Sequence, residues 1–401
     1  MRFTVQRDVL ADAVGWVARA LPTRPVIPVL AGLLLRASGG QLTLSCFDYE
    51  VSARVAVPAE VAEPGTALVP GRLLLEIIRS LPGLPVEFRD DPDGVLLESG
   101  EASFTLVTLP PDDYPELPGL PRLAGTADGG ALGLAIGQVT PAASRDDTLP
   151  LLTAVNLELA GTTMTLAATD RYRMAVRELG WEPAWSPGGG EEAVAILVPA
   201  RALADAARMM SAGTPVQIML SDAADSAEAM VGFEAGGRRL TTRLLAGEFI
   251  KYRSRFPAEF GCVADLPAEA FTEAVRRVSL VAERGTAVQL SFSPGRVTMV
   301  AATQGQARAR ETVHAEFSGD EPTIAFSPHY LLDGVVAAAA GTGAGGEGRA
   351  GRETIPDAAP TRVRLQFSGP AKPAVITPCP AADGKAEDSF RYLVVPQRVP
   401  Q

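Results

Sequence analysis

Apolar and polar residues alternate in two ways along the chain, and both patterns recur in a fixed order. Segments such as Leu42-Thr-Leu-Ser-Cys-Phe and Met164-Thr-Leu-Ala-Ala-Thr follow glycine-containing turns and alternate like half-buried strands. Stretches near residues 7–20, 134–145 and 267–283 carry apolar residues at helical spacing. These patterns predict antiparallel strands mixed with helices, which is an α+β fold.

The pattern is repeated three times. In each repeat an apolar strand end meets a proline and then a helix, and these prolines, Pro70, Pro199 and Pro328, are separated by 129 residues in both intervals. A proline at the first turn suits a helix start, because its missing N–H would be unpaired there. Each repeat is predicted to contain two helices and several strands. The predicted domains are residues 1–122, 123–256 and 257–401.

One stretch interrupts the third repeat. Residues 337–360 are rich in glycine and alanine and cannot bury much apolar surface, so a surface insertion at about residues 341–360 is expected. The spacing Gly341-x-Gly343-x-x-Gly346 formally matches a dinucleotide fingerprint. It follows an alanine-rich helix end and not a strand, which argues against that function.

Composition narrows the class of protein. Apolar residues make up 47% of the 401 residues, which excludes a wholly disordered chain. No apolar run reaches the roughly 18 residues of a membrane-spanning helix. Cys46, Cys262 and Cys379 are widely separated and form neither a disulfide framework nor a zinc motif, so a reducing compartment is expected. We expect a cytoplasmic protein without a membrane partner.

The overall charge argues against an ordinary basic nucleic-acid binder. Asp plus Glu outnumber Lys plus Arg by 47 to 36, and the formal net charge is -11. Only Lys251, Lys372 and Lys385 are lysines, so almost every positive charge is a guanidinium, which can bind a phosphate through two hydrogen bonds. Where these arginines lie therefore matters more than the total.

Groups for catalysis are scarce. His314 and His329 are the two histidines, and neither lies in a catalytic or metal-binding motif. The carboxylates of Asp90-Asp91-Pro-Asp93 could hold Mg²⁺, but Gly94 directly after them favours a hairpin turn. The sequence predicts no catalytic residue, no metal site and no cofactor, and so a protein that is not an enzyme.

Five motifs in order carry a resemblance to a known family. They are Arg2-Phe-Thr-Val, Arg24-Pro-Val-Ile-Pro-Val-Leu, Thr169-Asp-Arg-Tyr-Arg-Met-Ala-Val, Gly247-Glu-Phe-Ile-Lys-Tyr-Arg and Tyr392-Leu-Val-Val-Pro-Gln-Arg. Together with the threefold repeat, they resemble the bacterial sliding clamps, the beta subunits of DNA polymerase III. The resemblance covers essentially the whole chain except the insertion.

This resemblance implies a DNA clamp fold and a function. Two copies would join head to tail into a ring, with helices lining a central hole and antiparallel sheets outside. Double-stranded DNA would pass through the hole without sequence-specific contacts, so that topology and not tight phosphate binding keeps the ring in place. The implied partners are the polymerase III alpha subunit, the clamp loader and repair polymerases, which would bind through short peptide motifs.

The resemblance and the helical spacing select arginines for DNA contact. Arginines seven residues apart lie on the same face of a helix, as Arg72 does with Arg79 and Arg201 with Arg208. The candidates are Arg24, Arg72, Arg79, Arg201, Arg208, Arg276 and Arg277. The alternative is a solvated helix face with ion pairs such as Arg72–Glu76 and Arg201–Asp205.

The resemblance also implies a peptide-binding groove between the second and third repeats. Its residues would be Leu152, Thr169, Arg171, Tyr172, Arg173, Met174, Ile250, Ser254, Arg255, Val394, Val395, Pro396, Gln397 and Arg398. An apolar slot flanked by donors suits a peptide with leucine or phenylalanine anchors. For Leu152, Met174, Val394 and Val395, plain strand core is the alternative. Ile250 and Gln397 depart from the proline and large apolar residues usual in the family.

The implied dimer interface contains Phe104, Leu106 and Leu280, which occupy positions that are apolar in the family. Glu101 and Ser103 stand where basic residues often lie, which leaves the interface electrostatics open.

Three hypotheses follow. The first is a processivity clamp that tethers the replicative polymerase. The second is a divergent second-copy clamp whose groove discriminates among partners or inhibitors. The third, disfavoured by the scarcity of histidine, is an enzyme built on repeated α+β units.

Overall fold

The computed structural model describes residues 1–184, 193–221, 229–282, 286–303, 306–340, 361–379 and 389–397. The insertion at 341–360, with its glycine spacing, and Arg398 lie outside the described residues. The chain divides into two compact units, and the division runs through the middle repeat. Unit 1 comprises residues 1–129, 182–187 and 201–246, and unit 2 comprises residues 130–181, 188–200 and 247–401.

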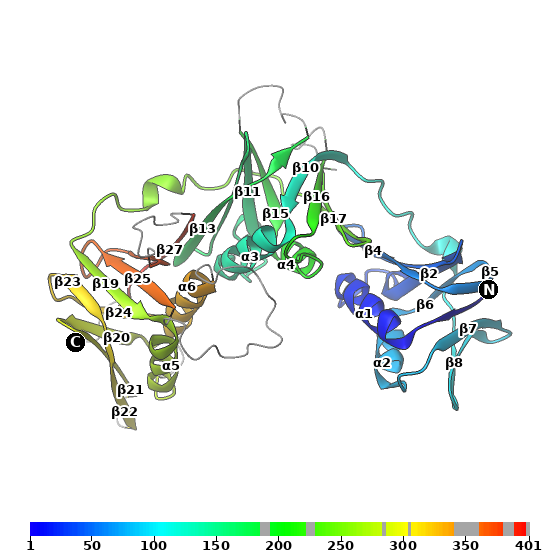
Figure 1. Cartoon of the computed structure of the whole chain (residues 1–401), viewed down its shortest axis with the longest axis horizontal. Coiled ribbons are helices and arrows are strands. Elements are labelled where there is room, and N and C mark those ends of the chain that lie inside the picture. The colour runs from blue at the N-terminus through cyan, green and yellow to red at the C-terminus, as the bar shows by residue number, and fades with distance from the viewer. Residues whose placement is uncertain are drawn as a thin grey trace. The chain divides into compact units, whose positions relative to one another are not determined.

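Unit 1 contains two antiparallel sheets (Figure 1). The five-stranded sheet has the order β5 (Glu60–Glu63), β1 (Arg2–Val5), β7 (Val86–Asp91), β8 (Gly94–Ser99) and β9 (Ala102–Leu106). The nine-stranded sheet has the order β14 (Glu182–Pro183), β10 (Arg122–Asp128), β16 (Pro215–Leu220), β17 (Met230–Ala235), β18 (Arg238–Arg243), β4 (Val51–Pro58), β3 (Gln41–Phe47), β2 (Gly32–Ser38) and β6 (Gly65–Pro70). The pairing of β18 with β4 joins strands of the first and second repeats.

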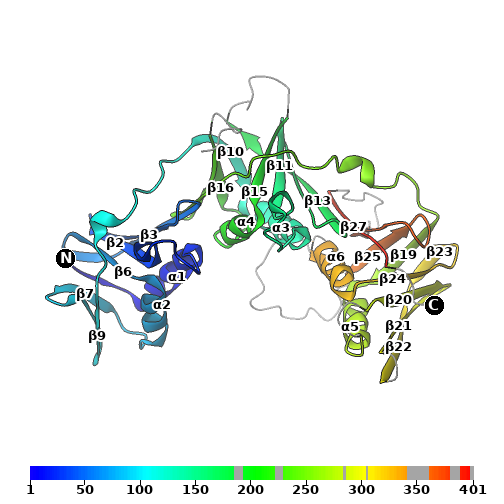
Figure 2. The same ribbon diagram turned by 180° about the vertical axis from the view of Figure 1, so that it is seen from behind.

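The helices of unit 1 are α1 (Arg7–Val17), α2 (Gly71–Ser80) and most of α4 (Ala200–Ala207). Helices α1 and α2 lie side by side (Figures 1 and 2). Both are amphipathic: α1 buries Leu10, Val14 and Val17, while α2 buries Leu74 and Ile78. Short 3₁₀ turns are η1 (Ala18–Ala20), η2 (Pro28–Ala31) and η3 (Pro111–Asp113).

Unit 2 also contains two antiparallel sheets. Its nine-stranded sheet has the order β15 (Val194–Pro199), β11 (Ala154–Ala160), β12 (Thr163–Thr169), β13 (Arg173–Gly180), β27 (Phe390–Val394), β26 (Ala374–Pro378), β25 (Arg362–Phe367), β19 (Cys262–Pro267) and β23 (Glu316–Gly319). The four-stranded sheet has the order β22 (Ala307–His314), β21 (Arg296–Thr303), β20 (Val288–Ser293) and β24 (Thr323–Phe326). The pairing of β13 with β27 joins strands of the second and third repeats.

The helices of unit 2 are most of α3 (Gly129–Val139), α5 (Ala268–Ser279) and α6 (Pro328–Ala340), with 3₁₀ turns η4 (Thr140–Ala142), η5 (Pro150–Leu152) and η7 (Arg253–Arg255). Helices α5 and α6 contact one another, and α6 also lies against β27. A side chain at Gly334 would collide with the Tyr392 ring, since its Cβ would fall 2.5 Å from Tyr392 Cδ1. Glycine at this position therefore lets α6 approach the sheet closely.

The predicted α+β elements are present, with differences at their ends. Helix α3 begins at Gly129, although a start near residue 134 is predicted from the sequence. A Cβ at Gly129 would lie 2.6 Å from the carbonyl oxygen of Ser211, so glycine is needed there for close approach. Pro70 and Pro199 end strands β6 and β15, whereas Pro328 is the first residue of α6. The boundaries 122/123 and 256/257 stay predictions.

The acidic run near residue 90 forms the predicted hairpin. Strand β7 ends at Asp91 and β8 begins at Gly94. Asp90 forms an ion pair with the N-terminal ammonium group, and Asp91 Oδ1 accepts a hydrogen bond from the backbone N–H of Asp93. These carboxylates therefore serve the hairpin and the N-terminus.

Candidate functional site

A pocket of about 610 Å³ lies in unit 2, where strands β12, β13 and β27 meet the segment after Gly247. The strands and the turn between β12 and β13 contribute Thr169, Arg171, Arg173, Met174, Leu393 and Val395. The remaining wall consists of Ile250, Ser254, Arg255 and Pro373. The pocket combines an apolar surface with three guanidinium groups.

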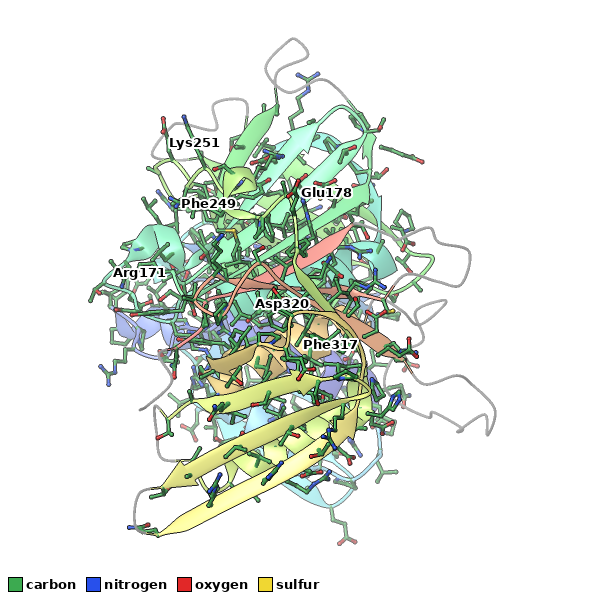
Figure 3. All side chains as sticks on the ribbon, turned by 90° about the vertical axis from the view of Figure 1, so that its left-hand side faces the viewer. Arg171, Glu178, Phe249, Lys251, Phe317 and Asp320 are labelled. Carbon is green, nitrogen blue, oxygen red and sulfur yellow. The ribbon has the colours of Figure 1, made fainter. Side chains whose placement is uncertain are left out.

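The floor of the pocket is an apolar cluster. Met174 and Leu393 are cross-strand partners on β13 and β27, and they pack with Ala167, Val176 and Tyr252. Phe249 (labelled in Figure 3), Phe256 and Val395 pack against this cluster and remain only partly buried. Such a surface can accept apolar side chains of a ligand without first having to open.

The segment after Gly247 is held onto the sheet by one ion pair and one buried ring. Arg253 Nη2 lies 2.5 Å from Glu158 Oε2 on β11. The Tyr252 ring is 3% exposed, and the guanidinium of Arg253 stacks 4.9 Å from its centroid. Burial raises the pKa of the Tyr252 hydroxyl above its ordinary value. This attachment fixes the wall that carries Ile250, Ser254 and Arg255.

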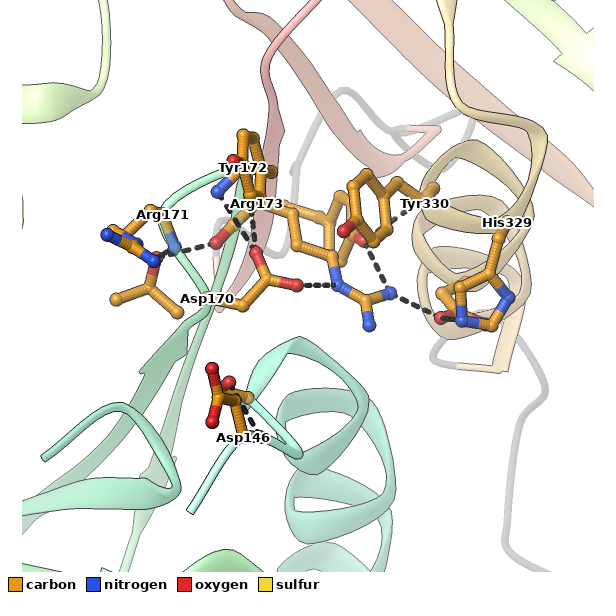
Figure 4. Close-up of polar contacts among 11 residues, drawn as sticks. Asp146, Asp170, Arg171, Tyr172, Arg173, His329 and Tyr330 are labelled. Atoms are coloured by element: carbon orange, nitrogen blue, oxygen red, sulfur yellow. Dashed lines mark hydrogen bonds and ion pairs between the residues drawn. The ribbon is translucent and has the colours of Figure 1, made fainter. Parts of the chain in front are cut away.

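The turn between β12 and β13 orients the polar side of the pocket. Asp170 Oδ1 accepts hydrogen bonds of 3.0 Å from the backbone N–H groups of Tyr172 and Arg173 (Figure 4). Arg171 has a φ of +81°, a left-handed conformation that non-glycine residues rarely adopt. The Asp170 side chain thus stabilises a strained turn whose next residues border the pocket.

Arg173 connects this turn to helix α6. Its side chain is only 6% exposed; Nε lies 3.0 Å from Asp170 Oδ2, and Nη1 donates to Asp333 and to the Tyr392 hydroxyl. Burial acts to lower the pKa of Arg173, but Tyr392, Asp333 and Asp170 outweigh it, so the pKa is raised and the guanidinium stays charged.

Two tyrosines extend the network to the surface. The Arg173 guanidinium lies 4.5 Å from the centroid of the Tyr330 ring, and Tyr330 stacks on Tyr172 with centroids 6.1 Å apart (Figure 4). Tyr172 is 56% exposed. Arg173 is therefore an internal anchor for the surface around the turn.

The structure brings most of the predicted groove residues together. Eight of them line the pocket: Thr169, Arg171, Arg173, Met174, Ile250, Ser254, Arg255 and Val395. Tyr172 and Pro396 lie beside it in the chain, and the backbone N–H of Gln397 bonds to Ala325. Leu152 lies in η5 and does not line the pocket, while Arg398 lies outside the described residues.

One further predicted groove residue does not line the pocket in the structure. Val394 is fully buried, and adjacent strand residues point to opposite faces, so its side chain faces away from Leu393 and Val395. Leu393, which is not among the predicted residues, lines the pocket. Leu393 and Val395 are two residues apart and therefore share one face of the strand, so this spacing could have identified Leu393 from the sequence. Nothing in the sequence indicated Pro373.

The candidate DNA-contact residues of the first repeat are exposed in unit 1. Arg72 and Arg79 lie on α2, and Arg24 lies in the loop before η2. The Arg72 guanidinium donates to the carbonyl oxygens of Leu21 and Pro22, at 3.4 and 3.3 Å. The alternative pair with Glu76 does not form among the described residues, so Arg72 steadies the loop that carries Arg24.

The remaining candidate arginines differ in how they are paired. Arg208 lies one residue beyond the end of α4 and is 3.6 Å from Asp205, whereas Arg201 has no ion pair within the described part of the chain. On α5, Arg276 likewise lacks a described ion-pair partner, but Arg277 binds both Glu273 and Glu311. Arg277 is therefore the candidate least free to bind a phosphate.

The predicted interface residues differ in exposure. Phe104 on β9 is 36% exposed and Leu280 after α5 is 84% exposed, but Leu106 is 1% exposed and belongs to the core of unit 1. Strands β9 and β22 are edge strands of their sheets and leave backbone groups available for pairing. Phe104 and Leu280 remain the side chains available to a second copy.

Within the described ranges, no three His, Cys, Asp or Glu side chains are grouped so that they could hold a metal ion. No described helix is both long and apolar enough to cross a membrane.

Comparison with known proteins decides the family. Residues 1–118, 128–251 and 253–340 match, in order, the N-terminal, central and C-terminal domains of the DNA polymerase III beta subunit. The chain is 46% identical over 399 residues to the beta sliding clamp of Streptomyces coelicolor, and the match covers 100% of both chains. The chain belongs to the bacterial beta sliding clamp family. Sliding clamps are processivity factors and not enzymes, and the predicted family and function are confirmed.

Further relatives support the fold of this sliding clamp. The chain is 41% identical over 398 residues to the beta sliding clamp homolog GriR of Streptomyces muensis, and this match covers 99% of both chains. The crystal structure of the Bacillus subtilis sliding clamp matches with a TM-score of 0.80 and 25% identity, covering 100% of this chain and 99% of that one. A Pseudomonas aeruginosa sliding clamp bound to griselimycin matches with a TM-score of 0.81 and 26% identity over both whole chains. The predicted clamp fold is confirmed.

Proposed function

We propose that two copies of this chain form a ring around duplex DNA and tether the replicative polymerase. The observation that carries the proposal is the full-length similarity to a beta sliding clamp, at 46% identity. The work of such a ring is mechanical, so the scarcity of catalytic groups is expected. Since the DNA that such a ring encircles is the bacterial chromosome, we place the chain in the cytoplasm.

Exposed arginines on the helices would provide weak contacts to the DNA backbone. Arg24, Arg72, Arg79, Arg201 and Arg276 are exposed and have no described ion-pair partner. Arg208 would have to share its charge with Asp205, and Arg277 with two glutamates. Contacts to phosphate position DNA without reading its sequence, and modest affinity permits sliding.

The pocket of unit 2 would bind short peptides of the polymerase III alpha subunit, the clamp loader and repair polymerases. Met174, Leu393 and Val395 offer an apolar surface for leucine or phenylalanine side chains. Arg171 and Arg255 at the same pocket can bind carboxylate or backbone carbonyl oxygens of the peptide.

Dimerisation would use the edge strands. We propose that β9 of one copy pairs with β22 of the other, with Phe104 and Leu280 covered at the contact. Exposed Arg308 and Arg310 on β22 would face the strand that follows Glu101. This arrangement offers opposite charges across the interface, although Glu101 stands where the family often has a basic residue.

Retention on circular DNA tests the proposal. A loaded ring should remain on a nicked circular plasmid during gel filtration and leave within minutes once a restriction enzyme linearises the plasmid. Light scattering should give the mass of a dimer. Equal loss from the circular and linear forms would remove the topological mechanism.

A second candidate function is a divergent second-copy clamp with altered partner choice. Two observations favour it: the clamp homolog GriR is 41% identical over 99% of both chains, and Ile250 borders the pocket where the family usually has proline. Affinities of polymerase peptides and of griselimycin are compared for the wild type and an Ile250→Pro, Gln397→Met variant. Unchanged affinities for both would exclude altered discrimination at these two positions.

A further inference from the structure

A second pocket, which we call the first-repeat pocket, lies wholly within unit 1. It has a volume of about 530 Å³. Its floor is the outer face of strands β2, β3, β4 and β6, with Leu34, Arg36, Thr43, Ser45, Arg54 and Thr66. Its wall is the segment around η3, with Tyr114, Leu117, Asp112 and Glu116. None of these residues belongs to the groove of unit 2 or to the candidate DNA contacts.

The wall of this pocket is firmly attached to the sheet. The Tyr114 hydroxyl accepts a hydrogen bond of 2.7 Å from the backbone N–H of Phe47, and the ring is 9% exposed. The backbone N–H of Leu109 bonds to the carbonyl oxygen of Leu68 at 2.8 Å. The pocket is therefore present before any ligand arrives, which lowers the entropic cost of binding.

Strand register identifies the matching positions in the second repeat. In the first repeat Arg36 pairs with Thr43, and Ser45 pairs with Arg54. In the second repeat Glu158 pairs with Thr165, and Ala167 pairs with Val176. Arg36 thus corresponds to Glu158, Ser45 to Ala167 and Arg54 to Val176. Tyr114, in the segment around η3, likewise corresponds to Tyr252, in the segment after Gly247, and both tyrosines are buried.

These replacements change the chemistry that the sheet presents below the two segments. In the second repeat, Ala167 and Val176 pack under Tyr252, and Glu158 binds Arg253 at 2.5 Å. In the first repeat a serine and two arginines stand at these positions, while Tyr114 packs in an apolar cluster with Phe47 and Leu68. The first-repeat pocket is therefore lined by polar side chains where the second repeat has apolar contacts and an ion pair.

The charges of the first-repeat pocket lack ion-pair partners within the described part of the chain. Arg36 and Arg54 are exposed and form no ion pair among the described residues, and the same holds for Asp112 and Glu116 across the pocket. The two carboxylates on the wall disfavour a polyanion such as a nucleic acid backbone. A ligand with a single carboxylate could bind the two arginines. If its remaining atoms were uncharged, Asp112 and Glu116 on the wall would not repel it.

The apolar part of the pocket adds a second requirement. Leu34 and Arg36 are two residues apart on β2, which places their side chains on one face about 6.6 Å apart. Side chains at i and i+2 of an extended peptide have the same spacing. A peptide with an acidic and an apolar side chain two residues apart can therefore bind Arg36 and Arg54 while it covers Leu34, Leu117 and Tyr114.

We propose that the first-repeat pocket is a second docking site, for an extended protein segment with an acidic and an apolar side chain at i and i+2. A partner could then bind unit 1 through this pocket while the groove of unit 2 is occupied by another peptide. The site uses charge complementarity at Arg36 and Arg54, whose counterparts in the second repeat are Glu158 and Val176.

The experiment uses full-length protein with ¹³C-labelled leucine and valine methyl groups. The probes are acetylated and amidated pentapeptides Gly-Glu-Ala-Leu-Gly and Gly-Leu-Ala-Glu-Gly, because chain direction is open, and matched peptides with Gln for Glu. At least one Glu peptide should shift the Leu34 and Leu117 methyl resonances saturably. The Gln peptides should bind about tenfold more weakly, since a neutral amide cannot form a charge-assisted hydrogen bond with the arginines.

Variants locate the binding site. The Arg36→Gln, Arg54→Gln variant should lose the preference for Glu over Gln, while Arg89→Gln, an exposed arginine of the same unit outside the pocket, should keep it. Both variants should stay on nicked circular DNA like the wild type, so a failure of docking is separable from a failure of clamping.

Five outcomes overturn the proposal. Four are absence of shifts at Leu34 and Leu117, equal affinity for the Glu and Gln peptides, shifts confined to Leu393 and Val395 in the groove, and tighter binding of a single-stranded oligonucleotide. The fifth concerns inorganic phosphate. If phosphate alone binds as tightly as the peptides, the pocket recognises a bare anion and not a protein segment.

Discussion

Replacement of Arg173 by methionine removes the charge at the centre of the polar network in unit 2 and keeps most of the side-chain volume. Arg173 is buried between Asp170 on its own turn and Asp333 on α6, and it also donates to Tyr392. Without the guanidinium, two carboxylates face each other across an uncharged side chain. We expect a large loss of stability in unit 2.

The magnitude follows from burial. Removal of one partner from a buried ion pair costs about 3–5 kcal/mol, because the other charge stays desolvated and unpaired. The side chains of Asp170 and Asp333 are 12% and 27% exposed, and water can solvate the second in part. The lower end, about 3 kcal/mol, is therefore expected. For a folding unit of this size that corresponds to a fall in melting temperature of about 6–12 °C.

Thermal unfolding followed by circular dichroism measures the effect, and Arg364→Met is the matched control. Arg364 lies on β25 of the same sheet and binds Asp265 through two hydrogen bonds of 2.7 and 2.8 Å, but its side chain is 31% exposed. Solvent reaches Arg364, and the nearby Arg362 still acts on Asp265 when Arg364 is removed, so this change should cost less than Arg173→Met.

The reasoning is refuted if Arg173→Met costs no more than Arg364→Met. A second check is a double-mutant cycle with Asp333→Asn. If Arg173 and Asp333 interact as described, the double variant should be more stable than the sum of the single effects predicts, by about 1–2 kcal/mol. Additive effects would mean that the ion pair with Asp333 contributes little.

Three further outcomes are expected. Arg171→Gly should raise the urea midpoint by an amount equivalent to about 1 kcal/mol, because glycine adopts a φ of +81° without strain; a lower midpoint would contradict this. Burial acts to raise the pKa of Asp265, but Arg364 outweighs it and holds that pKa below its ordinary 3.8. Its contribution to stability is thus present above pH 3.8 and disappears as the pH falls through the lower folded value, and an Asp265→Asn variant should lack this part of the acid dependence seen in urea unfolding. An Arg72→Gln, Arg79→Gln variant should lower the slope of log K for DNA against log salt by about 1 for each phosphate that is no longer neutralised, and an unchanged slope would remove both arginines from the set that binds DNA.

The sequence predicted the element types well because the repeats reinforce one another. Equal spacing of Pro70, Pro199 and Pro328 marked three strand-to-helix junctions, and all three exist in the structure. Alternation of apolar residues located the strands because one face of each strand is buried. Local patterns of this kind need no knowledge of distant partners.

Other features depended on interactions between distant residues. The continuation of each nine-stranded sheet across two repeats requires β18 to pair with β4 and β13 to pair with β27, which no local pattern encodes. The partner of Arg173 on α6 lies 160 residues away in the chain. Val394 is buried on the face opposite Leu393 and Val395, and the early start of α3 depends on the close approach of Gly129 to Ser211.

The repeats also show how one backbone supports different sites. Asp48 and Asp170 occupy the same position in successive repeats, and each accepts hydrogen bonds from the second and third N–H groups after it. The residue after each, Tyr49 and Arg171, has a positive φ of 75° and 81° respectively. Because the turn is fixed by the aspartate, the surrounding side chains are free to differ. Apolar side chains and a buried arginine make a peptide groove in the second repeat, while exposed arginines on the first-repeat sheet make a polar pocket. The net charge of -11 sums over such local differences, so it does not determine which ligand each repeat can bind.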